Sequence, residues 1–161
     1  MSTSIGVSSE WVLLAYRSPR EPSTRRIAVW RKLKRLGVAQ LTDGLVGLPL
    51  DARNREQLEW VADEVLEAGG EAELWIATPS SAAHERALAQ QLSDARAVEY
   101  AAVVADAATA ERLPLTARRR TLARLRRELR RIRKRDYFPP PERTRAQAAV
   151  QRLAELVEEP A

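Results

Sequence analysis

The sequence of 161 residues contains no cysteine and only one histidine, His84. Without cysteine there is no disulfide, no thiolate nucleophile and no cysteine-based metal site. A single histidine also excludes a histidine-rich metal centre. His84 precedes Glu85 at the expected start of a helix, where an ordinary surface residue is the simplest interpretation. We therefore predict no catalytic residue, no metal ligand and no enzymatic activity.

Other common signatures are missing as well. Neither standard spacing of a glycine-rich phosphate loop occurs. No apolar run approaches the ~18 residues that a transmembrane helix needs. The first ten residues, MSTSIGVSSE, have no basic region followed by an apolar one, so they do not resemble a secretory signal. These features predict a cytoplasmic protein that neither spans nor binds a membrane.

Positive charge is abundant and unevenly placed. Residues 1–36 carry 8 basic and 2 acidic groups. Residues 51–112 carry 5 basic and 13 acidic groups, and residues 113–135 carry 11 basic groups and 1 acidic group. The net charge of the whole chain is only +5, so the separation of charge is larger than the total suggests. Segregation of this kind indicates an anionic partner.

The first 79 residues alternate between short apolar runs and amphipathic stretches. WVLLAYR at 11–17 predicts a strand, and 25–36 predicts a helix with Ser23 or Thr24 as its cap and Gly37 as its stop. Residues 38–50 read as two strands around the Asp43-Gly44 turn. A helix from Asp51 to the glycine pair at 69–70 and a strand at 71–79 follow. This β-α-β-β-α-β order predicts an α+β fold, a ferredoxin-like sandwich over residues 1–79.

Three hydrophobic stripes, two of them within this region, predict which side chains are buried. In the first helix Ile27, Trp30, Leu33 (or Lys34) and Leu36 recur at helical spacing. In the second helix Leu58, Val61 and Val65 do so. In the helical pattern that begins at Ser80, Leu88, Leu92 and Ala95 form one face.

Residues 80–161 are predicted to be a helical extension of three helices separated by Pro114 and by the prolines at 139–141. Leu122, Leu125, Leu129 and Ile132 form a narrow seam in the second of them. Ala146, Ala149 (or Val150), Leu153 and Leu156 (or Val157) repeat it in the third. The two seams predict an antiparallel hairpin, which would bring Glu155, Glu158 and Glu159 beside Arg118, Arg119 and Arg120.

The basic residues outnumber these acids, and the surplus predicts contact with DNA phosphates through two helices. The predicted DNA-binding residues are Arg25, Arg26, Arg31, Lys32, Arg35, Arg124, Arg126, Arg127, Arg130, Arg131, Arg133, Lys134 and Arg135. A solvated surface without a ligand is the simpler alternative. Docking of the basic helix onto an acidic protein is another.

A smaller anion site is a further possibility. Arg17, Arg20 and Arg25 could converge on one tetrahedral oxyanion at the start of a helix, where guanidinium groups and backbone amides both favour negative charge. Chromate or sulfate would fit such a site, and no other cofactor is predicted. The alternative is that these arginines pair with acids of residues 51–71.

Several motifs resemble the N-terminal domain of the chromate-resistance regulator family ChrB. They are the first strand beginning at Trp11, PREPS, R..VWR.LK.LG, the DG hairpin, EQ.EW.A.E...AGGEA, ARAVEYA and R.IRKRDYFPP, spread over residues 10–141. The first half is also similar to the C-terminal part of PaaX-type repressors and to the CRISPR-associated nuclease of spacer acquisition. That nuclease has a metal-binding aspartate at the end of the first strand, where this chain has Arg17, and a guanidinium cannot ligate Mg²⁺.

The resemblance implies a chromate-responsive, DNA-binding transcriptional regulator. We expect a homodimer, because exposed sheet edges pair symmetrically and DNA half-sites favour two-fold proteins. The alternative function is a non-catalytic module that binds an oxyanion or docks an acidic protein through its arginine-rich helix.

Overall fold

The computed structural model describes residues 10–158, which form two compact units, one up to Leu88 and one from Ala89. Each unit is described by itself below. In chain order the elements are β1 (Trp11–Arg17), α1 (Ser23–Leu36), β2 (Ala39–Thr42), β3 (Leu45–Pro49), α2 (Ala52–Glu67), β4 (Glu71–Ala77), α3 (Ala82–Ala110), α4 (Leu115–Lys134) and α5 (Glu142–Glu158).

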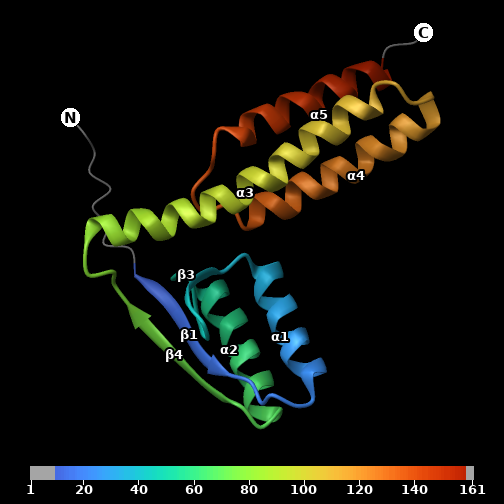
Figure 1. Cartoon of the computed structure of the whole chain (residues 1–161). Helices are drawn as coiled ribbons and strands as arrows, with labels where there is room; N and C mark the ends of the chain where they lie inside the picture. Colours follow the sequence, from blue (N-terminus) through green and yellow to red (C-terminus); the bar gives the residue numbers. More distant parts are fainter. Residues whose placement is uncertain (1–9, 159–161) are drawn as a thin grey trace. The chain divides into compact units, whose positions relative to one another are not determined.

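The first unit is built on a four-stranded antiparallel sheet with the order β2-β3-β1-β4. The central strand β1 pairs Leu14 with Val46 of β3 and with Leu74 of β4. Helices α1 and α2 lie on one face of this sheet (Figure 1). The predicted α+β class and the alternation of strands and helices are confirmed.

Local chemistry sets most element boundaries where the sequence predicted them. Asp51 caps α2, because its Oδ1 accepts a hydrogen bond from the backbone N–H of Asn54 at 2.6 Å. Gly37 ends α1 with φ of 74°, and Gly44 takes φ of 71° in the turn between β2 and β3. The predicted cap of α1 is wrong: Pro22 precedes its first residue, and Ser23 and Thr24 lie inside its first turn. Proline has no backbone N–H, so its position before the first turn of α1 leaves no donor of its own unpaired.

The predicted core of α2 is confirmed, and the predicted core of α1 is wrong in part. Leu58, Val61 and Val65 are all buried. In α1 the buried side chains are Val29 and Leu33. Ile27 and Trp30 are 44% and 53% exposed. Two stripes offset by about one residue share the same helical spacing, so periodicity did not distinguish Val29 from Trp30.

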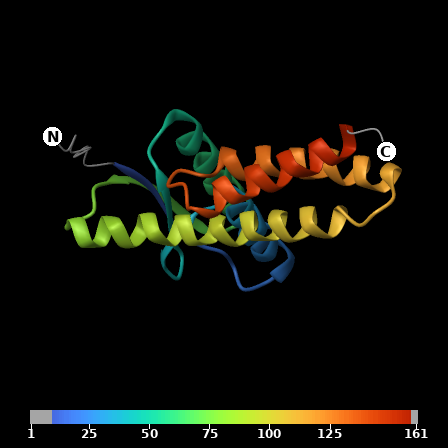
Figure 2. The ribbon, with the colours of Figure 1, turned by 90° about the horizontal axis from the view of Figure 1, so that it is seen from above.

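The second unit is a bundle of three helices: α3 from Ala89, α4 and α5. They lie side by side in both views (Figures 1 and 2). Its core contains Tyr100 and Val103 from α3, Leu125 and Ile132 from α4, and Leu153 from α5. The predicted seams of α4 and α5 are therefore confirmed in the main, with Leu129 and Ala149 partly buried. Earlier in α3, Leu88 and Leu92 are buried as predicted, but Ala95 is exposed.

The open end of the α4–α5 hairpin is held differently from the prediction. Arg118 donates to the backbone carbonyl of Leu156 at 3.2 Å, and to those of Glu111 and Leu113 at 3.3 and 3.0 Å. Within residues 10–158, neither Glu155 nor Glu158 forms an ion pair with Arg118, Arg119 or Arg120. Glu159 lies outside the described residues. Arg118 thus binds a carbonyl in the last turn of α5 and two carbonyls of the α3–α4 connection, where unpaired carbonyls attract a cation.

Candidate nucleic-acid interface

Helix α4 has one apolar side and one strongly basic side. Leu122, Leu125 and Ile132 are buried against the bundle. The remaining surface carries nine arginines and one lysine against one acid, Glu128. Repulsion among so many like charges opposes helix formation at spacings of three and four residues. Packing of the leucine seam is what keeps α4 helical and fixes which way its basic side faces.

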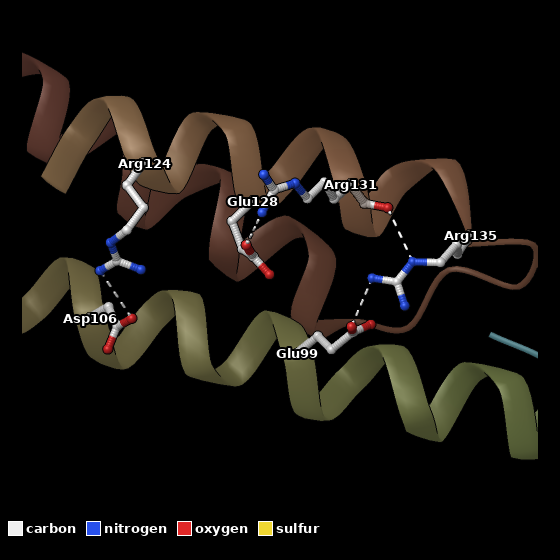
Figure 3. Close-up of polar contacts among 6 residues, drawn as sticks. All are labelled: Glu99, Asp106, Arg124, Glu128, Arg131 and Arg135. Carbon is white, nitrogen blue, oxygen red and sulfur yellow. Dashed lines mark hydrogen bonds and ion pairs between the residues drawn. The ribbon is translucent and has the colours of Figure 1, made fainter. Parts of the chain in front are cut away.

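Three of the predicted DNA-contacting arginines are engaged with carboxylates (Figure 3). Arg124 lies 3.3 Å from Asp106 of α3, and Arg131 lies 3.5 Å from Glu128, one turn away on its own helix. These two side chains stay 52% and 70% exposed, so their pairs are weak and open to competition from another anion. Arg135 differs: it lies 2.8 Å from Glu99, is 19% exposed, and also donates to the carbonyl of Arg131 at 3.3 Å.

The other predicted residues of α4 are exposed and form no ion pair with any residue from 10 to 158. They are Arg126, Arg127, Arg130, Arg133 and Lys134. Spacings of three, four and seven residues place Arg126, Arg130 and Arg133 in one row and Arg127 and Lys134 in the next. The result is a continuous cationic surface over about two and a half turns, called the free basic face below.

A buried polar cluster holds the C-terminal end of α4. Arg96 of α3 is 5% exposed and its Nε lies 2.6 Å from Glu99, the carboxylate that also binds Arg135. Burial lowers the pKa of Arg96, while the charge of Glu99 acts in the opposite direction. The Glu99 carboxylate therefore binds two guanidinium groups, that of Arg96 in α3 and that of Arg135 directly after α4.

Asp136, one residue beyond Arg135, completes this cluster. Its side chain is 0% exposed; it accepts a hydrogen bond from the Tyr100 hydroxyl at 2.7 Å and lies 3.8 Å from Arg143 of α5. Burial, followed by the bond to Asp136, raises the pKa of Tyr100. The cluster ties α3, α4 and α5 together, so the end of the free basic face is fixed by the fold.

Helix α1 of the first unit is a second, smaller basic surface. Arg25, Arg26, Arg31 and Arg35 are exposed, as predicted for phosphate contacts. Lys32 is half-buried and pairs with Glu64 of α2, so its charge is compensated within the unit. The ammonium of Lys34 lies 4.8 Å from the ring centroid of Trp30, a cation–π contact.

Two of the three arginines predicted to bind an oxyanion lie near acids. Arg17 ends β1 and its register partner on β4 is Glu71. Arg25 lines a cavity of about 240 Å³ together with Glu64 and Glu67. Arg20 is exposed in the segment between β1 and α1. Carboxylates beside Arg17 and Arg25 lower the local positive potential that a bound anion needs.

Sequence reasoning missed a cavity of about 430 Å³ beside α1. Its walls include Tyr16, Arg26, Trp30 and Asp43. Burial, and then the charge of Asp43, raises the pKa of Tyr16. The signal was present in the sequence as a tryptophan on a basic helix, but the helical spacing of Trp30 led to its interpretation as a core residue.

The described residues offer little for metal or membrane chemistry. Between residues 10 and 158 there is no group of three or more histidine, aspartate or glutamate side chains placed to hold a metal ion. None of the helices described is both long and apolar enough to cross a bilayer. His84 is exposed, and its backbone N–H donates to Ser81 Oγ at 3.1 Å, which makes it a first-turn surface residue as predicted.

Comparison with known proteins gives one match. The family model described as "Protein ChrB, N-terminal" matches residues 26–113, more than half of the chain. The matched region begins within α1, ends just beyond α3 and does not include β1, α4 or α5. Neither a curated protein nor a solved structure matches.

Proposed function

The chain belongs to the ChrB N-terminal family, and from this membership and its basic helices we propose that it is a DNA-binding transcriptional regulator of the chromate-resistance type. The matched residues include most of α1, from Arg26 onward, but end before α4. Membership therefore supports the regulatory role, while the role of α4 rests on its own charges.

The observation that carries the proposal is the free basic face of α4. Arg126, Arg127, Arg130, Arg133 and Lys134 are exposed at helical spacing, and no carboxylate among the described residues neutralises them. Duplex DNA presents a dense row of phosphates, and each phosphate that a protein cation neutralises releases a counterion. A rigid helix with cations in rows offers several such contacts at once. These contacts position the protein on DNA and carry little base information.

Helix α1 supplies a second set of phosphate contacts in this proposal. Arg25, Arg26, Arg31 and Arg35 are exposed there, and Lys32 is excluded because Glu64 compensates it. Each unit thus contributes one basic helix. A regulator of this kind acts on chromosomal DNA, so we place it in the cytoplasm and assign it no catalytic step.

We further assign the first unit to the ferredoxin-like sandwiches. The strand order β2-β3-β1-β4, with β1 antiparallel to both of its neighbours, supports this assignment. So does the β-α-β-β-α-β order with both helices on one face (Figure 1).

The test removes three charges from the free basic face and compares the variant with a matched control. The variant Arg126→Gln/Arg130→Gln/Arg133→Gln lowers the net charge from +5 to +2. Glutamine is nearly as good a helix former as arginine, so α4 stays folded. The control Arg53→Gln/Arg86→Gln/Arg112→Gln gives the same net charge from exposed arginines outside α1 and α4.

We expect duplex affinity, measured by fluorescence anisotropy at fixed salt with DNA from upstream of the gene, to fall about 100-fold or more in the variant. The control should lose less than about 10-fold, because it changes only the long-range potential. Equal losses in the two proteins would contradict a DNA contact on α4. Failure of the wild-type chain to bind any duplex would leave an acidic protein as the partner of this face.

A further inference from the structure

The two edges of the sheet in the first unit differ in a way that matters for assembly. The edge strand β2 has four residues and an irregular register between Gln40 and Thr42. Short, bulged edges are a common protection against pairing with another chain. The opposite edge strand, β4, has seven residues in unbroken register with β1. Among the described strands β1 is its only neighbour.

The free edge of β4 is also apolar where a soluble edge is usually charged. Trp75 and Ile76 are 56% and 48% exposed. Within β4 the only charges are Glu71 and Glu73, both at its start. A long, regular edge with exposed apolar residues is a template for strand addition, because its outward N–H and C=O groups are unpaired.

We propose that β4 pairs antiparallel with β4 of a second copy of this chain, in a register centred on Leu74. The two sheets then form one sheet of eight strands around a two-fold axis. This proposal concerns self-association and does not depend on DNA binding.

The charges of β4 select this register. Centred on Leu74, all seven residues pair: Glu71 faces Ala77, and Glu73 faces Trp75 of the partner strand. Moving the centre to Glu73 places two glutamates directly opposite each other, which is unfavourable. Moving it to Trp75 shortens the overlap. In this register the β4 strand of a second copy pairs with all seven residues of β4, and no two glutamates face each other.

The register makes a sign-specific prediction at position 75. Trp75→Lys and Trp75→Glu lose the same apolar side chain but place opposite charges against Glu73 of the partner. We expect the dimer dissociation constant of Trp75→Glu to be about 10-fold or more above that of Trp75→Lys, because both symmetric contacts change from attraction to repulsion. Adding Glu73→Lys to Trp75→Glu should restore the dimer.

Sedimentation of the full chain over a concentration series measures this. Trp60→Glu is the matched control, since Trp60 is 62% exposed on α2 and outside β4. It should dissociate no more readily than wild type. A wild-type chain that stays monomeric at every concentration would overturn the proposal, and so would equal dissociation constants for the two position-75 variants.

Disulfide cross-linking tests the same register without changing any charge. The chain has no cysteine, so one introduced thiol reports on one position. Leu74→Cys lies on the two-fold axis and should form a disulfide-linked dimer on oxidation. Ile76→Cys should not, because its partner position is Ala72 and the two thiols are about four residues apart along the strands. The reverse pattern would refute the register.

Discussion

Asp136 shows at the scale of single residues how the end of the basic helix is positioned. Its carboxylate is fully buried, accepts a hydrogen bond from the Tyr100 hydroxyl and lies near Arg143. A buried charge is tolerated only when it is paired and hydrogen-bonded. Asp136 is therefore a positioning residue: it orders the segment after α4 without being accessible to a ligand.

Replacing Tyr100 with phenylalanine tests this role. The ring still fills its buried site, but the Asp136 carboxylate loses the hydrogen bond that the Tyr100 hydroxyl donates. We expect the free energy of unfolding at neutral pH to fall by about 1–3 kcal/mol. Urea denaturation followed by circular dichroism measures it. A variant as stable as wild type would mean that the bond contributes nothing to the bundle.

The same pair of proteins has a defined pH dependence. Folding raises the pKa of Tyr100 above its ordinary value near 10, so folding favours the neutral phenol. This contribution is complete below about pH 10 and is lost as the pH rises toward the folded pKa. Between about pH 10 and 11 the wild type should lose about 1 kcal/mol relative to Tyr100→Phe. A gap that stays constant over this range would contradict the assignment.

Residue-level features were predictable where one side chain acts on its own backbone. Asp51 as a cap, and Gly37 and Gly44 at positive φ, follow from local chemistry. Most of the polar cluster was not predictable: Arg96 and Glu99 are one turn apart on α3, but Arg135, Asp136 and Arg143 join them only after the three helices have packed. RDYFPP drew attention as a motif, but its carboxylate points inward, and nothing in a linear pattern indicates that.

At the scale of elements, α4 combines a stabilising seam with a repulsive surface. The seam residues Leu122, Leu125 and Ile132 are buried, and Leu125 is fully so. The heptad spacing predicted the buried side of α4 correctly. The helix has only one apolar stripe, and most of its other residues are arginines. In α1 two overlapping stripes competed, and tertiary packing selected Val29 over Trp30.

Truncating the seam should loosen the bundle. We expect Leu125→Ala to lower the free energy of unfolding by about 2–5 kcal/mol, through lost apolar burial and the cavity left behind. Leu115→Ala, on the same helix but 45% exposed, is the control and should cost less than about 1 kcal/mol. Chemical denaturation of both variants provides the comparison. Similar losses would show that the seam is not what holds α4 in place.

At the scale of the whole molecule, charge is segregated by segment. Residues 51–112 are acidic, whereas residues 1–36 and 113–135 are basic. Composition alone indicated an anionic partner. It did not indicate which cations remain available, because that depends on pairs such as Arg124 with Asp106 and Arg135 with Glu99 (Figure 3). The structure reduces the predicted DNA-contacting residues of α4 to the five side chains of the free basic face, which form no ion pair with any described residue.

The most direct test of a DNA contact on this face is the salt dependence of duplex affinity. If Arg126, Arg127, Arg130, Arg133 and Lys134 each neutralise a phosphate, the logarithm of the association constant should fall with the logarithm of salt concentration with a slope of about −4.5 from these contacts alone. Exposed residues of α1 would make it steeper. A slope near zero would contradict the account.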